Sequence, residues 1–357
     1  MKRACYFGIY DLLHSRTRII KKGLASAGYE VIECQVDPRK ISGIKKYTEL
    51  IHKYRSLQKD KPFDLIVVGF PGYFTVLVVF AISSYPLIFD AYISYFDGVR
   101  DRKNYYLFHP RLWYAWSVDF LNGLVSDVVL TINFAYRDFF VSKLKVASRK
   151  MEVLHKGADE TVFFPRQALE NKSNTHVIGW WGSFIPLHGL PVIVEAAKHL
   201  ENSSNMEFHI YGGGQLRVDI GKQIKVNDVK NVKLLPFIPR PELVNKIKDF
   251  DLVLGIFNSS PKSQRCVTNK VYEAMAMGKA IITQNSEANR EIFTHKVNAY
   301  LVEPGNARAL ADAIIALVND KSLRDKIAKG AETIFKEKFA TKHIENEFVD
   351  ILRRHGL

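Results

Sequence analysis

The chain has 357 residues, and its 47% hydrophobic and 25% charged content is ordinary for a globular protein long enough for two domains, which excludes a disordered or fibrous chain. Cys5, Cys34 and Cys266 are odd in number and far apart, which argues against a disulfide framework and indicates a reducing, cytoplasmic compartment. The net charge is +14, and residues 1–150, with 23 basic and 13 acidic side chains, carry most of it.

In the first half of the chain, apolar runs of strand type alternate with stretches of helical spacing, the first of them Ser15–Ala27. The N-terminal apolar run is too short for a signal peptide. Residues 65–82 approach the length of a membrane-spanning helix, but Gly69, Pro71 and Gly72 interrupt them, so we interpret them as a buried strand, a turn and a buried helix. The predicted strands are residues 3–10, 28–36, 63–70, 86–92 and 127–133.

Strand-type runs return near Thr175 and again alternate with helical stretches. In TNKVYEAMAMGKAIIT, residues 269–277 have helical spacing, Thr268 is a candidate cap and Gly278 a candidate stop, and the run AIIT is a strand. The predicted strands of this half are residues 175–183, 206–214, 231–237, 250–257, 279–284 and 299–304.

This alternation predicts an α/β fold with two doubly wound, Rossmann-like domains that face a cleft, where ligands bind beyond the carboxyl ends of the strands. Residues 157–175 have loop composition and separate the two sets of strands. We therefore predict domains at 1–160 and 161–340, with a last helix in 341–357 that packs back on the first domain.

Two loops that follow predicted strands suit an anionic ligand. IYGGGQLR, residues 210–217, leads a strand into a glycine-rich turn, where the backbone can approach phosphate or sugar oxygens, although a tight turn alone would explain the glycines. IGWWGSFIPLHGL, residues 178–190, leads into a helix N-terminus, where His188 could add a donor, although a lone loop histidine is more often structural. The candidate ligand-binding residues of these loops are Gly182, Ser183, His188, Gly212, Gly213 and Gly214.

A third loop brings three cations, Lys262, Arg265 and Lys270, to the start of the helix that carries Glu273. Cations beside a helix N-terminus are unfavourable unless an anion lies between them. The Glu273 carboxylate suits a ribose diol, which needs an acceptor for two hydroxyls. Together these residues predict a sugar-nucleotide pocket, with basic groups for the diphosphate and Glu273 for the ribose.

The first domain offers candidates for the opposite side of the cleft. Asp90 ends a predicted strand and is expected to face the cleft, and Arg16 at the start of the first helix could meet acceptor phosphates or lipid headgroups. The aromatic segment Tyr105–Trp116 is either core or an edge that meets a membrane interface or a glycan. A charged loop, which is alternatively just solvated, supplies the further candidates Asp97, Arg102 and Lys103.

The motifs support neither a nucleic-acid partner nor a metal cofactor. The basic excess suits nucleic acid, an anionic membrane surface, a phosphate-bearing substrate or a merely solvated surface. Zinc-finger spacing, a basic zipper and RNP-type aromatics are missing from the sequence, so we expect no nucleic-acid partner. Asp249 and Asp251 form a D-x-D pattern, but they precede a buried strand and are interpreted as structural, so we expect no metal cofactor.

In this order, the motifs resemble the donor half of glycosyltransferase family 4, a group of retaining enzymes with the GT-B fold. The resemblance runs from about His155 to the end of the chain and adds Phe237, Ile238 and Asn269 to the expected donor-binding residues. Its motifs are WGSFIPLHGLPVIVEAA, IYGGGQL, NVKLLPFIPRPELVNKIKDFDLVLGIF, NKVYEAMAMGKAIIT, NREIF and AYLVEPGNARALADAI.

The chain departs from the family pattern at its charged residues. Of the family's E-x7-E pair, Glu273 matches the second acid, and Arg265 stands in place of the first. The family's usual arginine and lysine correspond to about Ser183 and His188. We therefore expect Lys262 and Arg265 to supply the phosphate charge and to act as catalytic residues.

The resemblance implies a metal-independent, retaining hexosyltransferase that uses a nucleoside-diphosphate sugar and a lipid-linked or glycan acceptor. The family's histidine of the first domain falls near Tyr92, and Asp90 is the candidate catalytic substitute. We expect the protein to work in cell-surface polysaccharide or glycolipid assembly, in the cytoplasm at the inner face of an anionic membrane. The alternatives are a non-catalytic sugar-nucleotide or glycan-binding protein of the same fold and, third, a sugar-nucleotide epimerase.

Overall fold

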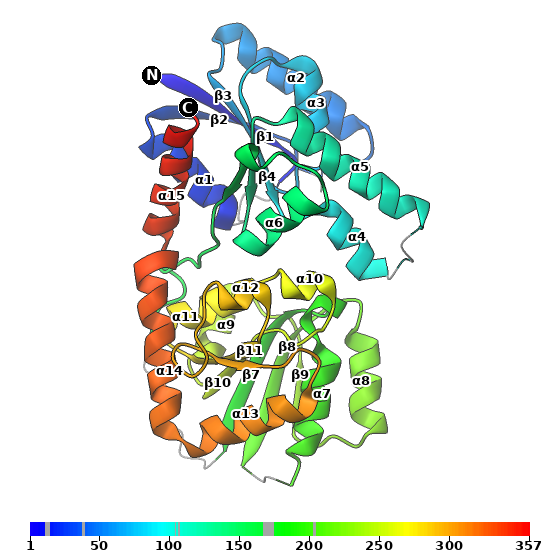
Figure 1. The fold of residues 1–357 in the computed structure, drawn as a ribbon, viewed down its shortest axis with the longest axis vertical. Helices are drawn as coiled ribbons and strands as arrows, with labels where there is room; N and C mark the ends of the chain where they lie inside the picture. Colours follow the sequence, from blue (N-terminus) through cyan, green and yellow to red (C-terminus); the bar gives the residue numbers. More distant parts are fainter. Residues whose placement is uncertain (11–14, 38–39, 104, 106–107, 167–174, 203–204) are drawn as a thin grey trace. The chain divides into compact units, whose positions relative to one another are not determined.

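The computed structural model describes the chain except residues 11–14, 38–39, 104, 106–107, 167–174 and 203–204 (Figure 1). The chain divides into two compact units. The first unit comprises Met1–Lys156 together with Thr341–Leu357, and the second comprises Gly157–Ala340. The first boundary lies beside the segment of loop composition, and the last helix belongs to the first unit.

The first unit is a parallel six-stranded sheet with strand order β2-β1-β3-β4-β5-β6. Its short apolar runs are buried on both faces, as parallel strands covered by helices require. The short strand β6 escaped the sequence analysis. The strands are β1 (Lys2–Gly8), β2 (Tyr29–Gln35), β3 (Leu65–Val68), β4 (Leu87–Tyr92), β5 (Val128–Thr131) and β6 (Met151–Val153).

Helices cover both faces of this sheet: α1 lies on one face with α15, and α2, α3 and α5 cover the other (Figure 1). Residues 65–82 form a strand, a turn and a helix, as predicted. The predicted charged loop is wrong, because residues 95–103 form helix α4. The helices are α1 (Ser15–Ser26), α2 (Lys45–Asp60), α3 (Thr75–Ile82), α4 (Tyr95–Lys103), α5 (Pro110–Val125), α6 (Phe134–Ser142) and α15 (Thr341–Arg354).

The last helix, α15, packs on α1, as the sequence suggested. Their backbones come so close that a Cβ on Gly23 would lie 2.7 Å from the ring of Phe348. Both oxygens of Glu347 on α15 contact His155, at its backbone N–H (2.9 Å) and at Nδ1 (2.7 Å). The C-terminal helix is therefore part of the first unit's packing.

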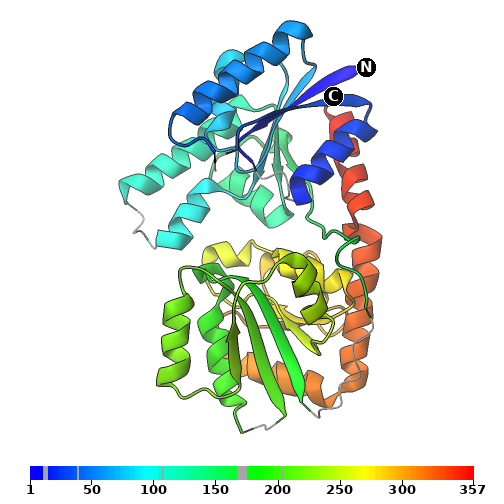
Figure 2. The same ribbon diagram turned by 180° about the vertical axis from the view of Figure 1, so that it is seen from behind.

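The second unit is also a parallel six-stranded sheet, with order β12-β11-β10-β7-β8-β9. The strand order reverses between β7 and β10, so these two strands flank the switch point at which doubly wound sheets bind ligands. Figure 2 shows these strands from behind. The strands are β7 (His176–Ser183), β8 (Met206–Gly213), β9 (Val232–Leu235), β10 (Leu252–Leu254), β11 (Ala280–Gln284) and β12 (Tyr300–Val302).

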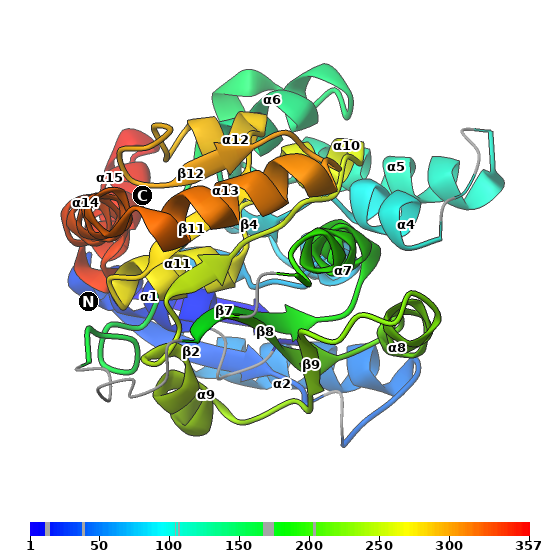
Figure 3. The same ribbon diagram turned by 90° about the horizontal axis from the view of Figure 1, so that it is seen from below.

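Helices α7 and α13 pack together on one face of the second sheet, and α9 and α11 lie on the other (Figure 3). Helix α11 begins at Asn269 and ends before Gly278, whose φ of 62° suits glycine at a helix stop. Thr268 holds the N-cap position, but its hydroxyl makes no capping hydrogen bond. The helices are α7 (Leu190–His199), α8 (Arg217–Val226), α9 (Arg240–Ile247), α10 (Pro261–Gln264), α11 (Asn269–Ala276), α12 (Glu287–Arg290), α13 (Ala307–Asn319) and α14 (Lys321–Ile334).

Candidate functional site

The candidate site lies at the carboxyl edge of the second sheet, where β7 and β8 end side by side. Their parallel register runs from His176 opposite Met206 to Ser183 opposite Gly213, so both loops leave the sheet together. A Cβ on Gly212 would lie 2.0 Å from the Gly182 carbonyl oxygen, which only glycine avoids. The space over Gly213 is open. Gly212 thus lets the two backbones pack tightly, and Gly213 beside it presents open backbone to a ligand.

The loop after β7 is fastened to the loop after β10 across the switch point. The Phe257 N–H donates to the His188 carbonyl (3.2 Å), and the Asn258 amide donates to the Pro186 carbonyl (2.8 Å). Gly189 has a φ of 67°, and a Cβ there would lie 2.6 Å from the Asn258 nitrogen. These contacts fix the backbone that leads into the N-terminus of α7.

His188 is buried in this loop, against the ring of Trp180 (centroids 5.5 Å apart). Its Nδ1 lies 2.6 Å from the carbonyl oxygen of Ser183. A carbonyl only accepts, so Nδ1 carries the proton and the ring orientation is set. The predicted His188 therefore belongs to the edge of the site, held by the same loop as Ser183.

Lys270, on the first turn of α11, is the most unusual group at this edge. Its side chain is only 4% exposed, and its Nζ has no hydrogen-bond partner among the residues that the structure describes. The Nζ lies 4.0 Å from the centre of the Trp180 ring, and a Cβ on Gly182 would lie 3.5 Å from it. Desolvation holds the pKa of Lys270 well below its ordinary value, and the Glu273 charge opposes this shift.

Glu273 lies one helical turn after Lys270. Its Oε2 accepts a hydrogen bond from the indole N–H of Trp181 (2.7 Å). Desolvation raises the pKa of the Glu273 carboxyl, while Trp181, Arg240 and Lys270 oppose the rise. Trp180 and Trp181, neighbours on β7, thus contact the two charged residues of α11. The sequence analysis missed these two tryptophans, although a tryptophan pair in a strand is a visible signal.

The predicted cations Lys262 and Arg265 lie in the same connection between β10 and α11. Lys262 is on α10, which packs against the short turn Pro186–His188, and its side chain is 5% exposed. Arg265 caps the carboxyl end of α10 and is half-buried. The structure therefore brings the α10 segment and the His188 loop together.

Buried amides that the sequence analysis did not single out hold α10 in place. The Gln284 amide donates to the Ser263 carbonyl (2.8 Å), and the Asn289 amide donates to the Gln284 carbonyl (2.8 Å). The remaining residues predicted to bind the donor are less enclosed. Phe237 is 77% exposed, Ile238 is half-buried and Asn269 is exposed.

Comparison with known sequences agrees with this geometry. Residues 175–320, most of the second unit, match the family described as Glycosyl transferases group 1. The matched part of the second unit is therefore similar to glycosyltransferases of group 1. This part carries the switch point, the glycine-rich edge, Lys270 and Glu273.

A curated protein to which the chain is similar is a poly(ribitol-phosphate) alpha-N-acetylglucosaminyltransferase of Staphylococcus aureus. It is 24% identical over 178 residues, which is 49% of this chain but only 35% of the relative. The match spans about a third of that protein, so the activity of the whole relative bears on this chain only as a proposal.

Solved structures extend the likeness to both units. A sucrose-phosphate synthase from Thermosynechococcus elongatus superposes with a TM-score of 0.79 at 12% identity over 99% of each chain. Anabaena Alr3699/HepE, in complex with UDP and glucose, superposes with a TM-score of 0.72 at 16% identity, again over 99% of each chain. These likenesses confirm the predicted GT-B fold.

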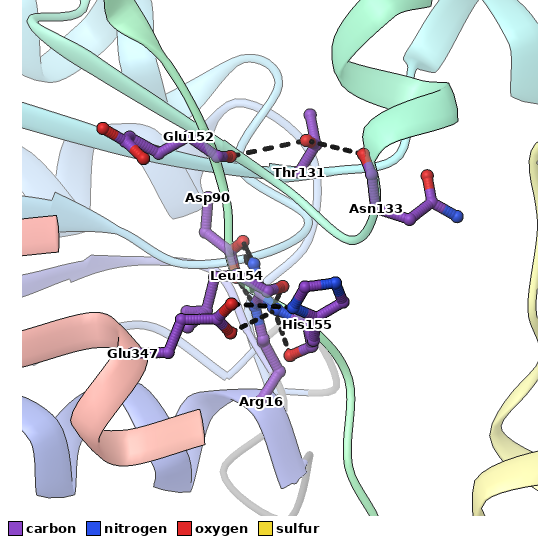
Figure 4. A network of polar contacts seen from close by, with 8 residues as sticks. All are labelled: Arg16, Asp90, Thr131, Asn133, Glu152, Leu154, His155 and Glu347. Atoms are coloured by element: carbon purple, nitrogen blue, oxygen red, sulfur yellow. Dashed lines mark hydrogen bonds and ion pairs between the residues drawn. The ribbon is translucent and has the colours of Figure 1, made fainter. Parts of the chain in front are cut away.

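In the first unit, two predicted site residues prove to be partners. Asp90 is fully buried, and Arg16 donates to it from Nε (3.1 Å) and Nη2 (2.8 Å) (Figure 4). The Arg16 Nη1 donates to the carbonyls of Leu154 and His155. The expectation that Asp90 faces a cleft and Arg16 meets an acceptor is therefore wrong, because the two are enclosed with each other.

The other first-unit candidates are divided between core and surface. Asp97, an acceptor-side candidate, is 1% exposed and accepts a hydrogen bond from the Tyr136 hydroxyl (3.2 Å), so the alternative of a solvated loop residue does not hold for it. Arg102 is exposed on α4, and Lys103 ends that helix, its side chain lying outside the described part of the chain. Tyr92, where the family histidine is expected, has a φ of 61°, which is strained for a bulky residue.

Two further searches covered the described residues. They contain no group of three or more histidine, cysteine, aspartate or glutamate side chains placed to hold a metal ion. Among the described helices, none combines the length and apolar character needed to cross a membrane.

Proposed function

We propose that the chain transfers a hexose from a nucleoside-diphosphate sugar to a lipid-linked or glycan acceptor, as a retaining, metal-independent glycosyltransferase of cell-surface polysaccharide or glycolipid assembly. The observation that carries the proposal is Lys270: a buried cation without a hydrogen-bond partner in the described chain, beside the glycine-rich edge of a unit similar to glycosyltransferases of group 1. The complex of Alr3699/HepE with UDP and glucose supports a nucleotide-sugar donor. The name of the poly(ribitol-phosphate) relative supports a glycan acceptor.

Breaking the sugar–phosphate bond leaves negative charge on the diphosphate, and stabilising that charge is the main task of the site. Lys270 would meet the diphosphate beside Gly182, with the ammonium already desolvated and so strongly felt by an anion. The α10 cations Lys262 and Arg265 and the N-terminus of α7 would add to the field. Because Trp180 and the α11 backbone hold Lys270, little reorganisation is needed at the moment of transfer.

Glu273 would hold the donor ribose. Trp181 occupies Oε2 and orients the carboxylate, so Oε1 is the oxygen expected to accept from a ribose hydroxyl. The ribose and the diphosphate of one donor would then lie along one helix, with Glu273 and Lys270 one turn apart.

A panel of nucleotide sugars tests this proposal, first by the shift in melting temperature and then by turnover with glycan and lipid-linked acceptors. We expect at least one donor to stabilise the protein and to be consumed. No stabilisation by any nucleotide sugar would contradict the proposal. A matched control is Lys222→Met, at an exposed lysine of α8, which should respond to donors like the parent.

One observation favours a second function, a non-catalytic sugar-nucleotide or glycan-binding protein: Arg265 stands where the family resemblance expects an acid. Under the transferase proposal, Arg265→Ala lowers turnover about a hundredfold or more, and Arg265→Glu does not restore it, because the new charge would repel the phosphates. Donor stabilisation without transfer or hydrolysis in the parent would favour the binding protein. Full activity of Arg265→Glu would show that residues other than Arg265 balance the phosphate charge.

A further inference from the structure

Helix α5 of the first unit presents a row of large apolar side chains to solvent. Trp113 and Tyr114 are each 58% exposed, Leu124 is 59% exposed and Leu121 is 39% exposed. Positions 113, 117, 121 and 124 lie on one helical face, where Trp113 with Tyr114 and Leu121 with Leu124 form two apolar groups on either side of Ser117; we call this face the α5 stripe. Large apolar side chains gathered on one face mark an interaction site more often than single exposed side chains do.

The fold does not need this stripe. The opposite face of α5 buries Leu112, Ala115 and Val118 in the first unit, together with Asp119. The only acid between residues 108 and 125 is therefore turned away from the solvent stripe.

A basic segment, residues 143–150, packs against α5. The indole N–H of Trp116 donates to the Lys143 carbonyl (2.9 Å), and the Lys150 ammonium donates to the Leu124 carbonyl (2.7 Å). A Cβ on Gly123 would lie 2.3 Å from the Val146 side chain, so helix and segment are in close contact. The segment KLKVASRK, with no acid from 139 to 151, supplies Lys143, Lys145, Arg149 and Lys150.

We propose that this surface, the α5 stripe with the basic segment 143–150, docks the protein on an anionic lipid bilayer. Trp113 and Tyr114 have an apolar body and a polar tip, the chemistry that suits the headgroup level of a membrane. The surrounding lysines and arginines match anionic headgroups. A protein partner of this surface would need an acidic rim around an apolar patch, whereas an anionic bilayer offers charged headgroups and an apolar interior together. The inference is independent of the donor chemistry at the second unit.

Flotation of the full chain with phosphatidylcholine vesicles, with and without phosphatidylglycerol, tests the inference. We expect binding to the anionic vesicles that weakens as salt screens the charges. Trp113→Ser/Tyr114→Ser should lower the partition coefficient about tenfold or more, because two large apolar side chains no longer leave water. Lys143→Glu/Lys145→Glu should lower it mainly at low salt.

The matched control is Val226→Ser, at an 82% exposed apolar side chain of the second unit, which should float like the parent. Thermal melting and UDP binding in solution, unchanged in all these variants, show that each remains folded. Equal recovery with neutral and anionic vesicles would overturn the inference. So would a dimer in light scattering that Trp113→Ser/Tyr114→Ser dissociates while the parent fails to float, because the stripe would then seat a second copy.

Discussion

Both units bury a cation near their sheets, but they satisfy it in opposite ways. In the first unit, Arg16 is enclosed with Asp90 and two backbone carbonyls. In the second unit, Lys270 faces the Trp180 ring, and no hydrogen-bond partner of its Nζ is found in the described chain. The same architecture thus holds one cation, Arg16, that a carboxylate of the protein neutralises, and another, Lys270, that a bound anion would neutralise.

The difference separates stability from function. Removing one partner of a buried ion pair leaves an uncompensated charge, and this is strongly destabilising. Removing a buried cation that has no hydrogen-bond partner relieves a desolvation penalty instead. Substitutions at the two positions should therefore act on different measurements.

The largest effect is expected for Asp90→Asn. The buried Arg16 would lose its counter-charge, and the free energy of unfolding should fall by about 3–5 kcal/mol. Denaturant unfolding measures it. Asp138→Asn, at an exposed acid paired with Arg137, is the matched control and should change stability by less than about 1 kcal/mol. If Asp90→Asn melted like the parent but lost turnover, Asp90 would be catalytic after all.

Next is Lys270→Met, which keeps the length of the side chain and removes its charge. Turnover should fall about a hundredfold or more, the loss seen when one preorganised stabiliser is removed. Melting temperature should stay the same or rise, because methionine has no buried amine to desolvate. Steady-state kinetics and thermal melting decide it together, and a destabilised variant with ordinary turnover would show that Lys270 serves the fold.

A smaller effect is the pH dependence that Lys270 confers on stability. Its pKa in the folded protein lies well below its value in the unfolded chain, so between the two the unfolded state binds the extra proton. The free energy of unfolding should therefore rise with pH across this window, by up to about 1.4 kcal/mol per pH unit.

UDP should flatten that rise, because a bound diphosphate favours the charged amine and brings the two pKa values together. Melting curves of the parent and of Lys270→Met, with and without UDP, measure the difference. A parent whose pH profile matches that of Lys270→Met in the absence of UDP would mean that the amine is not perturbed.

A further effect, on nucleotide affinity alone, is expected for Glu273→Gln. The ribose would lose a charged hydrogen bond worth roughly 1.5–3 kcal/mol, so affinity for a free nucleoside diphosphate should fall by at least about tenfold. Titration calorimetry measures it, with Glu287→Gln at an exposed position of α12 as control. Unchanged affinity would contradict the proposal that Glu273 holds the ribose.

Local patterns predicted much of this molecule. Buried parallel strands are continuous apolar runs, and glycine at a φ of 62° ends α11 where Gly278 predicted a stop. The pairing of Arg16 with Asp90 could not be predicted, because 74 residues separate them and only tertiary packing joins them. Asp90 therefore looked like an exposed strand end. Helix α4 was missed because its sequence, YFDGVRDRK, is charged, contains glycine and shows no apolar stripe.

The second unit was easier because its site is carried by loops whose residues are close in sequence. Lys270 and Glu273 are one turn apart on one helix, so their proximity was visible in advance. Their contacts with Trp180 and Trp181 were not, because the contacts join residues about ninety positions apart. The sequence thus predicted which groups would meet a ligand, whereas the structure shows which of the charged groups are paired within the protein.

The packing of α15 on α1 has a consequence for the order in which the chain is made. The helix Thr341–Arg354 is translated after the whole of residues 157–340, yet it belongs to the first unit. While the second unit is being translated, the α1 surface around Gly23 lacks its contact with Phe348. The unit that begins to emerge first is therefore the last to be completed, and an early stop in translation would leave it open beside a finished second unit.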